Sequence, residues 1–62
     1  MPAVTIDELV NALYLDLKES YTSLTRDWLK AEAEKQLAGA EPTGGPGAFL
    51  NRYLKKTGLL KG

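Results

Sequence analysis

Apolar side chains in the first part of the chain recur at steps of three and four residues, and this spacing limits the possible folds more than any other feature. The series is Ile6, Val10, Leu13, Leu17, Tyr21 and Leu24. At 3.6 residues per turn these positions share one face, so the spacing predicts an amphipathic α-helix. Thr5 and Glu8 fit a capping box at its start, in which each side chain accepts the backbone N–H of the other residue.

The end of this helix has two interpretations, because the apolar stripe continues in phase through Trp28 and Ala31. Residues 20–25 are rich in serine and threonine, which compete for backbone hydrogen bonds and favour helix caps. Thr25 fits the N-cap of a second helix, with Asp27 in its first turn. We therefore expect a break near residues 21–24, before the cap at Thr25. The alternative is one long helix that continues without interruption.

Glycine and proline mark a loop in the second half of the chain, and a third helical pattern follows it. Residues 39–47 contain four glycines and two prolines and are predicted to form this loop. Beyond it, apolar and basic residues separate onto opposite sides of a helix at 100° per residue. The apolar side holds Phe49, Leu50, Tyr53, Leu54 and Thr57, and the other side holds Arg52, Lys55 and Lys56. Gly58 is expected to end this helix.

The predicted fold is a single all-α domain over residues 1–62 with three short helices. Their expected ranges are about 5–20, 25–38 and 46–57. In the alternative, one helix over 5–38 is followed by a short C-terminal helix. We expect the third helix to pack its aromatic face onto the first two.

The chain has 62 residues and contains neither cysteine nor histidine, which leaves few ways to supplement a small core. A core of this size contributes about 3 to 5 kcal/mol, and small domains usually add disulfides, a metal ion or a second subunit. The absence of Cys and His excludes disulfides, thiolate chemistry and the zinc sites that need these ligands. Self-association is the expected supplement, so we expect a homodimer.

The residue types and their spacing do not indicate catalysis, a cofactor or a membrane segment. Without His or Cys, the possible acids, bases and nucleophiles are carboxylates, lysines, tyrosines, Ser20 and Ser23, and no spacing pairs them. No run of about 18 apolar residues occurs, and the first residues do not have the pattern of a secretory signal. We expect a cytoplasmic, non-enzymatic protein that binds no cofactor, metal ion or membrane.

Positive and negative charges are divided between the two ends of the chain. Residues 1–41 hold all eight acids and four bases, a net charge of −4, whereas residues 42–62 hold four bases and no acid, a net charge of +4. These last four bases are Arg52, Lys55, Lys56 and Lys61. We expect the acids of the first two helices to compensate them partly. They could also contact nucleic acid or an acidic partner. Because the sequence pI is about 6.1 and nucleic-acid-binding domains are usually basic, nucleic-acid binding through the third helix is the alternative function.

Leu15 lies about 180° from the centre of the first apolar stripe and is a candidate contact with a second chain. Leu29 or Leu37 would accompany it, and Trp28 is a further candidate because tryptophan is enriched at binding hot spots. The plainer alternative is that Leu15 is an isolated exposed leucine. The predicted function is a small helical protein–protein interaction or regulatory module that self-associates, with its partner interface at Leu15, Trp28, Leu29 and Leu37.

Overall fold

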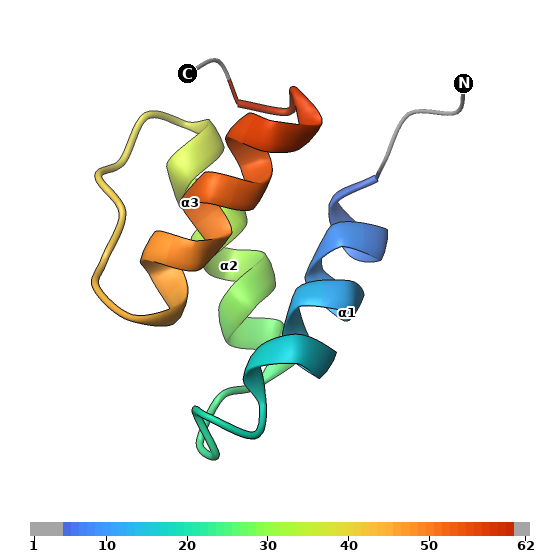
Figure 1. The fold of residues 1–62 in the computed structure, drawn as a ribbon. Helices are drawn as coiled ribbons and strands as arrows, with labels where there is room; N and C mark the ends of the chain where they lie inside the picture. The colour runs from blue at the N-terminus through green and yellow to red at the C-terminus, as the bar shows by residue number, and fades with distance from the viewer. Residues whose placement is uncertain (1–4, 61–62) are drawn as a thin grey trace.

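A computed structural model describes residues 5–60 of the chain as three α-helices joined by two loops (Figure 1). The helices are α1 (Ile6–Leu17), α2 (Arg26–Leu37) and α3 (Pro46–Thr57). α1 and α3 each pack against α2 more extensively than against each other. The predicted all-α fold of three short helices is confirmed, and the alternative of one continuous helix over 5–38 is wrong. None of the helices in the described part of the chain combines the length and the apolar character needed to cross a membrane.

The ends of the helices follow the capping signals of the sequence. At the start of α1, Thr5 Oγ1 accepts the backbone N–H of Glu8 at 3.1 Å and Glu8 Oε1 accepts that of Thr5 at 3.2 Å, which completes the capping box. Thr25 Oγ1 accepts the backbone N–H of Trp28 at 3.1 Å at the start of α2. Gly39 and Gly58, with φ of 105° and 85°, follow α2 and α3 in the left-handed conformation that glycine adopts most easily.

α1 ends at Leu17, three residues before the predicted position, because the chain turns twice between α1 and α2. The backbone N–H of Tyr21 donates to the carbonyl of Leu17 at 2.8 Å, and that of Leu24 donates to the carbonyl of Tyr21 at 2.9 Å. The turns change the phase of the apolar pattern. Trp28, which would have continued the stripe of α1, is therefore 41% exposed, and Leu29 faces the core instead.

The core is a cluster of eight buried aliphatic side chains from all three helices. They are Leu9, Val10, Leu13, Leu17, Leu29, Ala33, Leu50 and Leu54. α3 contributes Leu50 and Leu54, whereas Tyr53 is half-buried and Phe49 is 39% exposed. α3 therefore packs by the expected face through Leu50, Leu54 and Tyr53, and only the expectation for Phe49, which is exposed, is corrected.

α3 runs in the same direction as α2, and the loop between them returns along the length of α2 (Figure 1). A helix of 12 residues is about 18 Å long, and the eight residues from 38 to 45 can span up to about 26 Å. The loop is therefore long enough for this return. It brings the start of α3 back beside α2, with Gly47 next to Glu32, and with Pro46 in a groove shared with Trp28 and the loop that joins α1 and α2.

A buried polar network holds the returning loop and α3 against α2. The side-chain amide of Gln36 donates to Glu32 Oε2 and to the backbone carbonyl of Gly47, both at 3.0 Å, and accepts from Asn51 Nδ2 at 3.1 Å. The backbone N–H and hydroxyl of Thr43 both donate to Glu32 Oε2 at 3.4 Å. Among the described residues, every buried side-chain nitrogen and oxygen has a hydrogen-bond partner. The network therefore satisfies the polar groups that α2 buries.

Candidate functional site

An open groove of about 570 Å³ lies where the two interhelical loops meet. Its lining comes from residues 20–24 of the first loop, Trp28 in the first turn of α2, Thr43 and Gly44 of the second loop, and Pro46 at the start of α3. We call it the Trp28 groove. It exists because the second loop carries the start of α3 back to the first loop.

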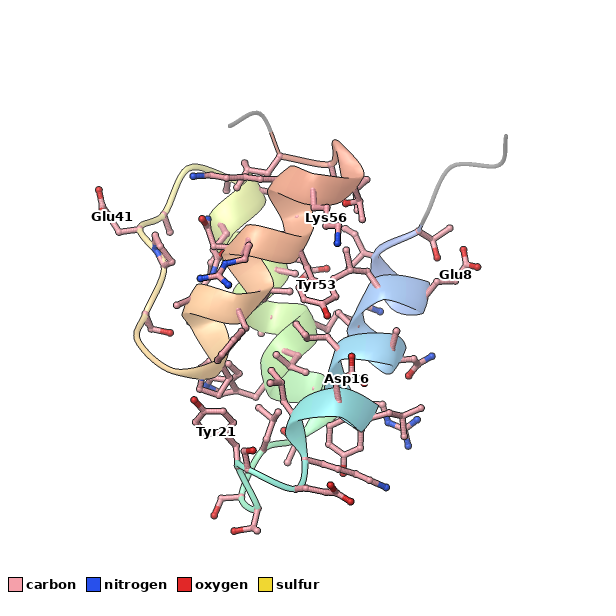
Figure 2. The ribbon with its side chains drawn as sticks, in the orientation of Figure 1. Glu8, Asp16, Tyr21, Glu41, Tyr53 and Lys56 are labelled. Carbon is pink, nitrogen blue, oxygen red and sulfur yellow. The ribbon has the colours of Figure 1, made fainter. Side chains whose placement is uncertain are left out.

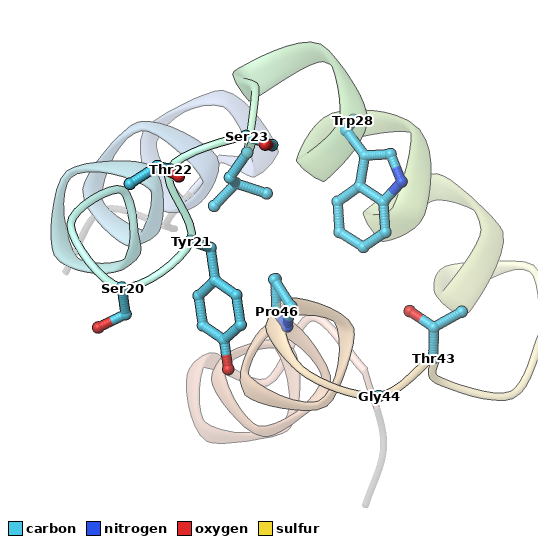
Figure 3. A pocket seen from close by; sticks show the side chains of 9 residues that line it. Ser20, Tyr21, Thr22, Ser23, Trp28, Thr43, Gly44 and Pro46 are labelled. Carbon is cyan, nitrogen blue, oxygen red and sulfur yellow. The ribbon is translucent and has the colours of Figure 1, made fainter.

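Aromatic side chains from two elements stand on either side of the Trp28 groove. In Figure 3, Pro46 lies between the ring of Tyr21 and the indole of Trp28. Tyr21 is half-buried and packs against the core, and its ring approaches Gly45, where a Cβ atom would lie 3.4 Å from Cε1 of the tyrosine. None of the lining residues carries a charged side chain. The groove therefore offers apolar and hydroxyl-bearing surface.

The walls of the groove are held by the hydrogen bonds that shape the loops. The turns at Tyr21 and Leu24 fix the first loop, the Thr25 cap fixes the backbone of Trp28, and the contact of Thr43 with Glu32 fixes the second loop. Within residues 5–60, neither the indole N–H of Trp28 nor the hydroxyl of Tyr21 donates to another protein group. Both donors are free to meet a ligand in a groove that is already formed.

The structure separates the four residues that the sequence assigned to a partner interface. Trp28 lines the groove, and Leu15 is 60% exposed on the outer side of α1. Leu37 is half-buried against the core. Leu29 has no exposed surface, so its inclusion in a partner interface is corrected: it faces inward because the turns before α2 change the phase of the apolar pattern.

The basic residues of α3 lie on its outer side. Arg52, Lys55 and Lys56 are exposed, and the guanidinium of Arg52 lies over the ring of Phe49 with 5.8 Å between its carbon and the ring centroid. Lys61 lies outside the described residues.

The expected pairing of these bases with acids of the first two helices is not found within residues 5–60. The one ion pair there joins Lys30 Nζ of α2 to Asp7 Oδ1 of α1 at 3.3 Å, and both side chains are exposed. The positive charge of α3 therefore has no acid of the same described chain within ion-pair distance.

The described residues form no group of three or more acidic side chains that could hold a metal ion. Comparison with protein families, with curated proteins and with solved structures found no match for this chain.

Proposed function

We propose that this chain is a small non-enzymatic protein–protein interaction module that binds a partner protein through the Trp28 groove and also self-associates. The observation that carries the first part is the partly exposed Trp28 beside Tyr21 and Pro46, in a groove without charged side chains. Tryptophan and tyrosine are the residue types most enriched among interface residues that dominate binding energy.

The properties of the Trp28 groove support binding of an apolar side chain from a partner. Its volume of about 570 Å³ lies within the range of about 300 to 1,000 Å³ found for ligand sites. Its walls are fixed by hydrogen bonds before any partner arrives, which lowers the ordering cost of binding. The free indole N–H and tyrosine hydroxyl can hydrogen-bond a partner's backbone carbonyl groups.

Selection from a displayed peptide library tests the use of this groove. Peptides retained by the wild-type chain should change the fluorescence of Trp28, the single tryptophan of the chain. Their affinity, measured by the anisotropy of a labelled peptide, should fall at least about tenfold for Trp28→Ala, which corresponds to about 1.4 kcal/mol. Lys35→Ala is the control, because it truncates an exposed side chain of the same helix outside the groove lining and should leave the affinity unchanged. Peptides that bind both variants equally well would contradict the proposal.

The self-association part is supported by Leu15, which is 60% exposed on the outer side of α1. A single exposed leucine is common on protein surfaces, but this one belongs to a chain too small to gain much stability from its own core. A second subunit would supply the missing apolar burial. The mass of the particle in solution tests this part independently of the groove.

A further inference from the structure

The outer face of α1 carries acids around Leu15. At 100° per residue, five exposed residues of α1 and the turn after it fall within an arc of about 100°. They are Glu8, Ala12, Leu15, Asp16 and Glu19. Lys18 lies about 60° beyond the edge of the arc at Leu15. We call this set the acidic face. It consists of one large apolar side chain, one alanine and three carboxylates.

The outer face of α3 has the same pattern with the opposite charge. Five exposed residues fall within an arc of about 120°. They are Ala48, Phe49, Arg52, Lys55 and Lys56, and we call this set the basic face. It consists of one large apolar side chain, one alanine and three bases. Figure 2 shows Glu8 and Asp16 on α1 and Lys56 on α3.

Both faces are open within the described protomer. The single ion pair of residues 5–60 uses Asp7 and Lys30, which belong to neither face. α1 and α3 lie on different sides of α2 and make little contact with each other. The acidic face of a protomer therefore does not cover its own basic face.

We propose that the acidic face of one copy of this chain docks on the basic face of a second copy, and that the reverse contact forms at the same time around a twofold axis. This inference rests on the self-association proposed above. Leu15 of one protomer packs near Phe49 of its partner, and the alanines allow the helices to approach closely. The carboxylates meet the bases, so the charges of α3 that lack partners inside the protomer are paired between protomers.

The contact between Arg52 and the ring of Phe49 favours a carboxylate-bearing partner over a nucleic acid. The Arg52 guanidinium covers the ring of Phe49, so that face of the ring is not free to stack on a base. The same guanidinium offers its N–H groups to a carboxylate, with which arginine forms paired hydrogen bonds. Three bases would also give nucleic-acid binding a salt slope of only about −2.7. A second copy supplies both the carboxylates and an apolar contact.

The two-face contact is tested by exchanging the charges of the two faces. The dissociation constant of the dimer is measured by sedimentation at about 50 mM salt, where surface charges are weakly screened. The acid variant is Asp16→Lys with Glu19→Lys, and the base variant is Lys55→Glu with Lys56→Glu. Glu8 is left intact because it caps α1. Each variant should raise the dissociation constant of the dimer at least about tenfold, because like charges then face each other. The four changes combined in one chain restore complementarity and should return the constant to within about threefold of the wild-type value.

Two controls separate this inference from the proposal on which it rests. Glu34→Lys with Glu41→Lys changes the net charge as the acid variant does but lies outside both faces, and it should leave the dimer unchanged. Circular dichroism should show unchanged helix content for every variant. A wild-type dimer that resists all charge reversals would overturn the two-face contact while leaving self-association intact. A wild-type chain that stays monomeric up to about 1 mM would overturn both, since even a weak specific contact of about −4 kcal/mol would then be detected.

Two further outcomes would also overturn the inference. Masses that grow beyond the dimer with concentration would indicate an open head-to-tail contact instead of a closed twofold one. Binding of labelled single-stranded DNA more tightly than the second copy, lost in the base variant and kept in the acid variant, would assign the basic face to nucleic acid.

Discussion

The side-chain amide of Gln36 donates a hydrogen bond to the backbone carbonyl of Gly47 at 3.0 Å and so joins the third turn of α2 to the first turn of α3. Gln36 is 99% buried in this position, and its amide oxygen accepts from Asn51 one turn further along α3. A single side chain of α2 therefore contacts two successive turns of α3, which runs in the same direction. This contact fixes where α3 begins, and with it the position of Pro46 in the Trp28 groove.

Replacement of Gln36 by leucine should destabilise the fold, although leucine is more apolar. The change leaves the amide of Asn51 and the carbonyl of Gly47 without their partner in a buried region, at a cost of about 1 to 3 kcal/mol. Urea denaturation followed by circular dichroism measures the free energy of unfolding. Lys35→Leu, on the exposed neighbouring position, is the control and should change stability by less than about 0.5 kcal/mol. An equally small effect of Gln36→Leu would show that the network does not stabilise the fold.

Gly47→Ala should destabilise the protein because the added Cβ atom would meet neighbouring side chains. A Cβ atom at position 47 would collide with Oγ1 of Thr43 and lie 3.3 Å from Oε2 of Glu32. In an open helix this change would stabilise by about 1 kcal/mol, so a loss of stability indicates the steric contact. Thr43→Ala in the same chain should recover part of the loss.

The control for this pair is Gly44→Ala, since nothing lies within 4 Å of a Cβ atom at position 44. It should change the melting temperature by only a few degrees at most, because surface changes of about 0.5 kcal/mol have effects of that size. If Gly47→Ala raised the melting temperature, the close packing of the second loop on α3 would be contradicted.

Thr25→Ala should destabilise α2 by removing its N-cap. The threonine hydroxyl accepts the backbone N–H of Trp28 at 3.1 Å, and loss of such a cap costs about 0.5 to 2 kcal/mol. Trp28 emission should also move, because the cap fixes the backbone of that residue. Thr22→Ala, in the same loop and without such a bond, should leave both stability and emission nearly unchanged.

Leu29 and Leu15 should respond very differently to replacement by alanine. Leu29 has no exposed surface, and truncation of a buried leucine costs about 2 to 5 kcal/mol, which is most of the stability of a domain this small. Leu15 is 60% exposed, so Leu15→Ala should change the stability of the protomer by less than about 0.5 kcal/mol. The unfolding free energies should be compared at a concentration that keeps both variants monomeric. Similar losses for the two would contradict the burial described for α2.

Local signals in the sequence predicted the helices because each signal acts over a few residues. Thr5, Glu8, Thr25 and Gly58 stand at helix ends in the structure, as the sequence predicts. Leu29 was assigned to the wrong surface because its side of α2 depends on the turns at Tyr21 and Leu24. A series of apolar residues at i, i+4 spacing, such as the one that contains Leu29, does not by itself show whether that side of the helix faces the core or a partner.

The Trp28 groove depends on contacts between residues that are far apart in the sequence. Pro46 was expected at the start of α3, but only the return of the second loop along α2 brings it to Tyr21 and Trp28. Glu32 and Gln36, which hold that loop, form a polar i, i+4 pair of the kind usually found in solvent. The spacing of residues in the sequence does not show that Thr43 and Asn51 are hydrogen-bond partners of Glu32 and Gln36.

Self-association through Leu15 is tested most directly by the masses of the wild-type chain and of Leu15→Glu, measured by light scattering behind a sizing column at low salt. We expect twice the chain mass of 6.8 kDa for the wild type, and the single-chain mass with unchanged helix content for Leu15→Glu. A wild-type particle of single-chain mass at every concentration reached, with the same stability as Leu15→Glu, would contradict self-association.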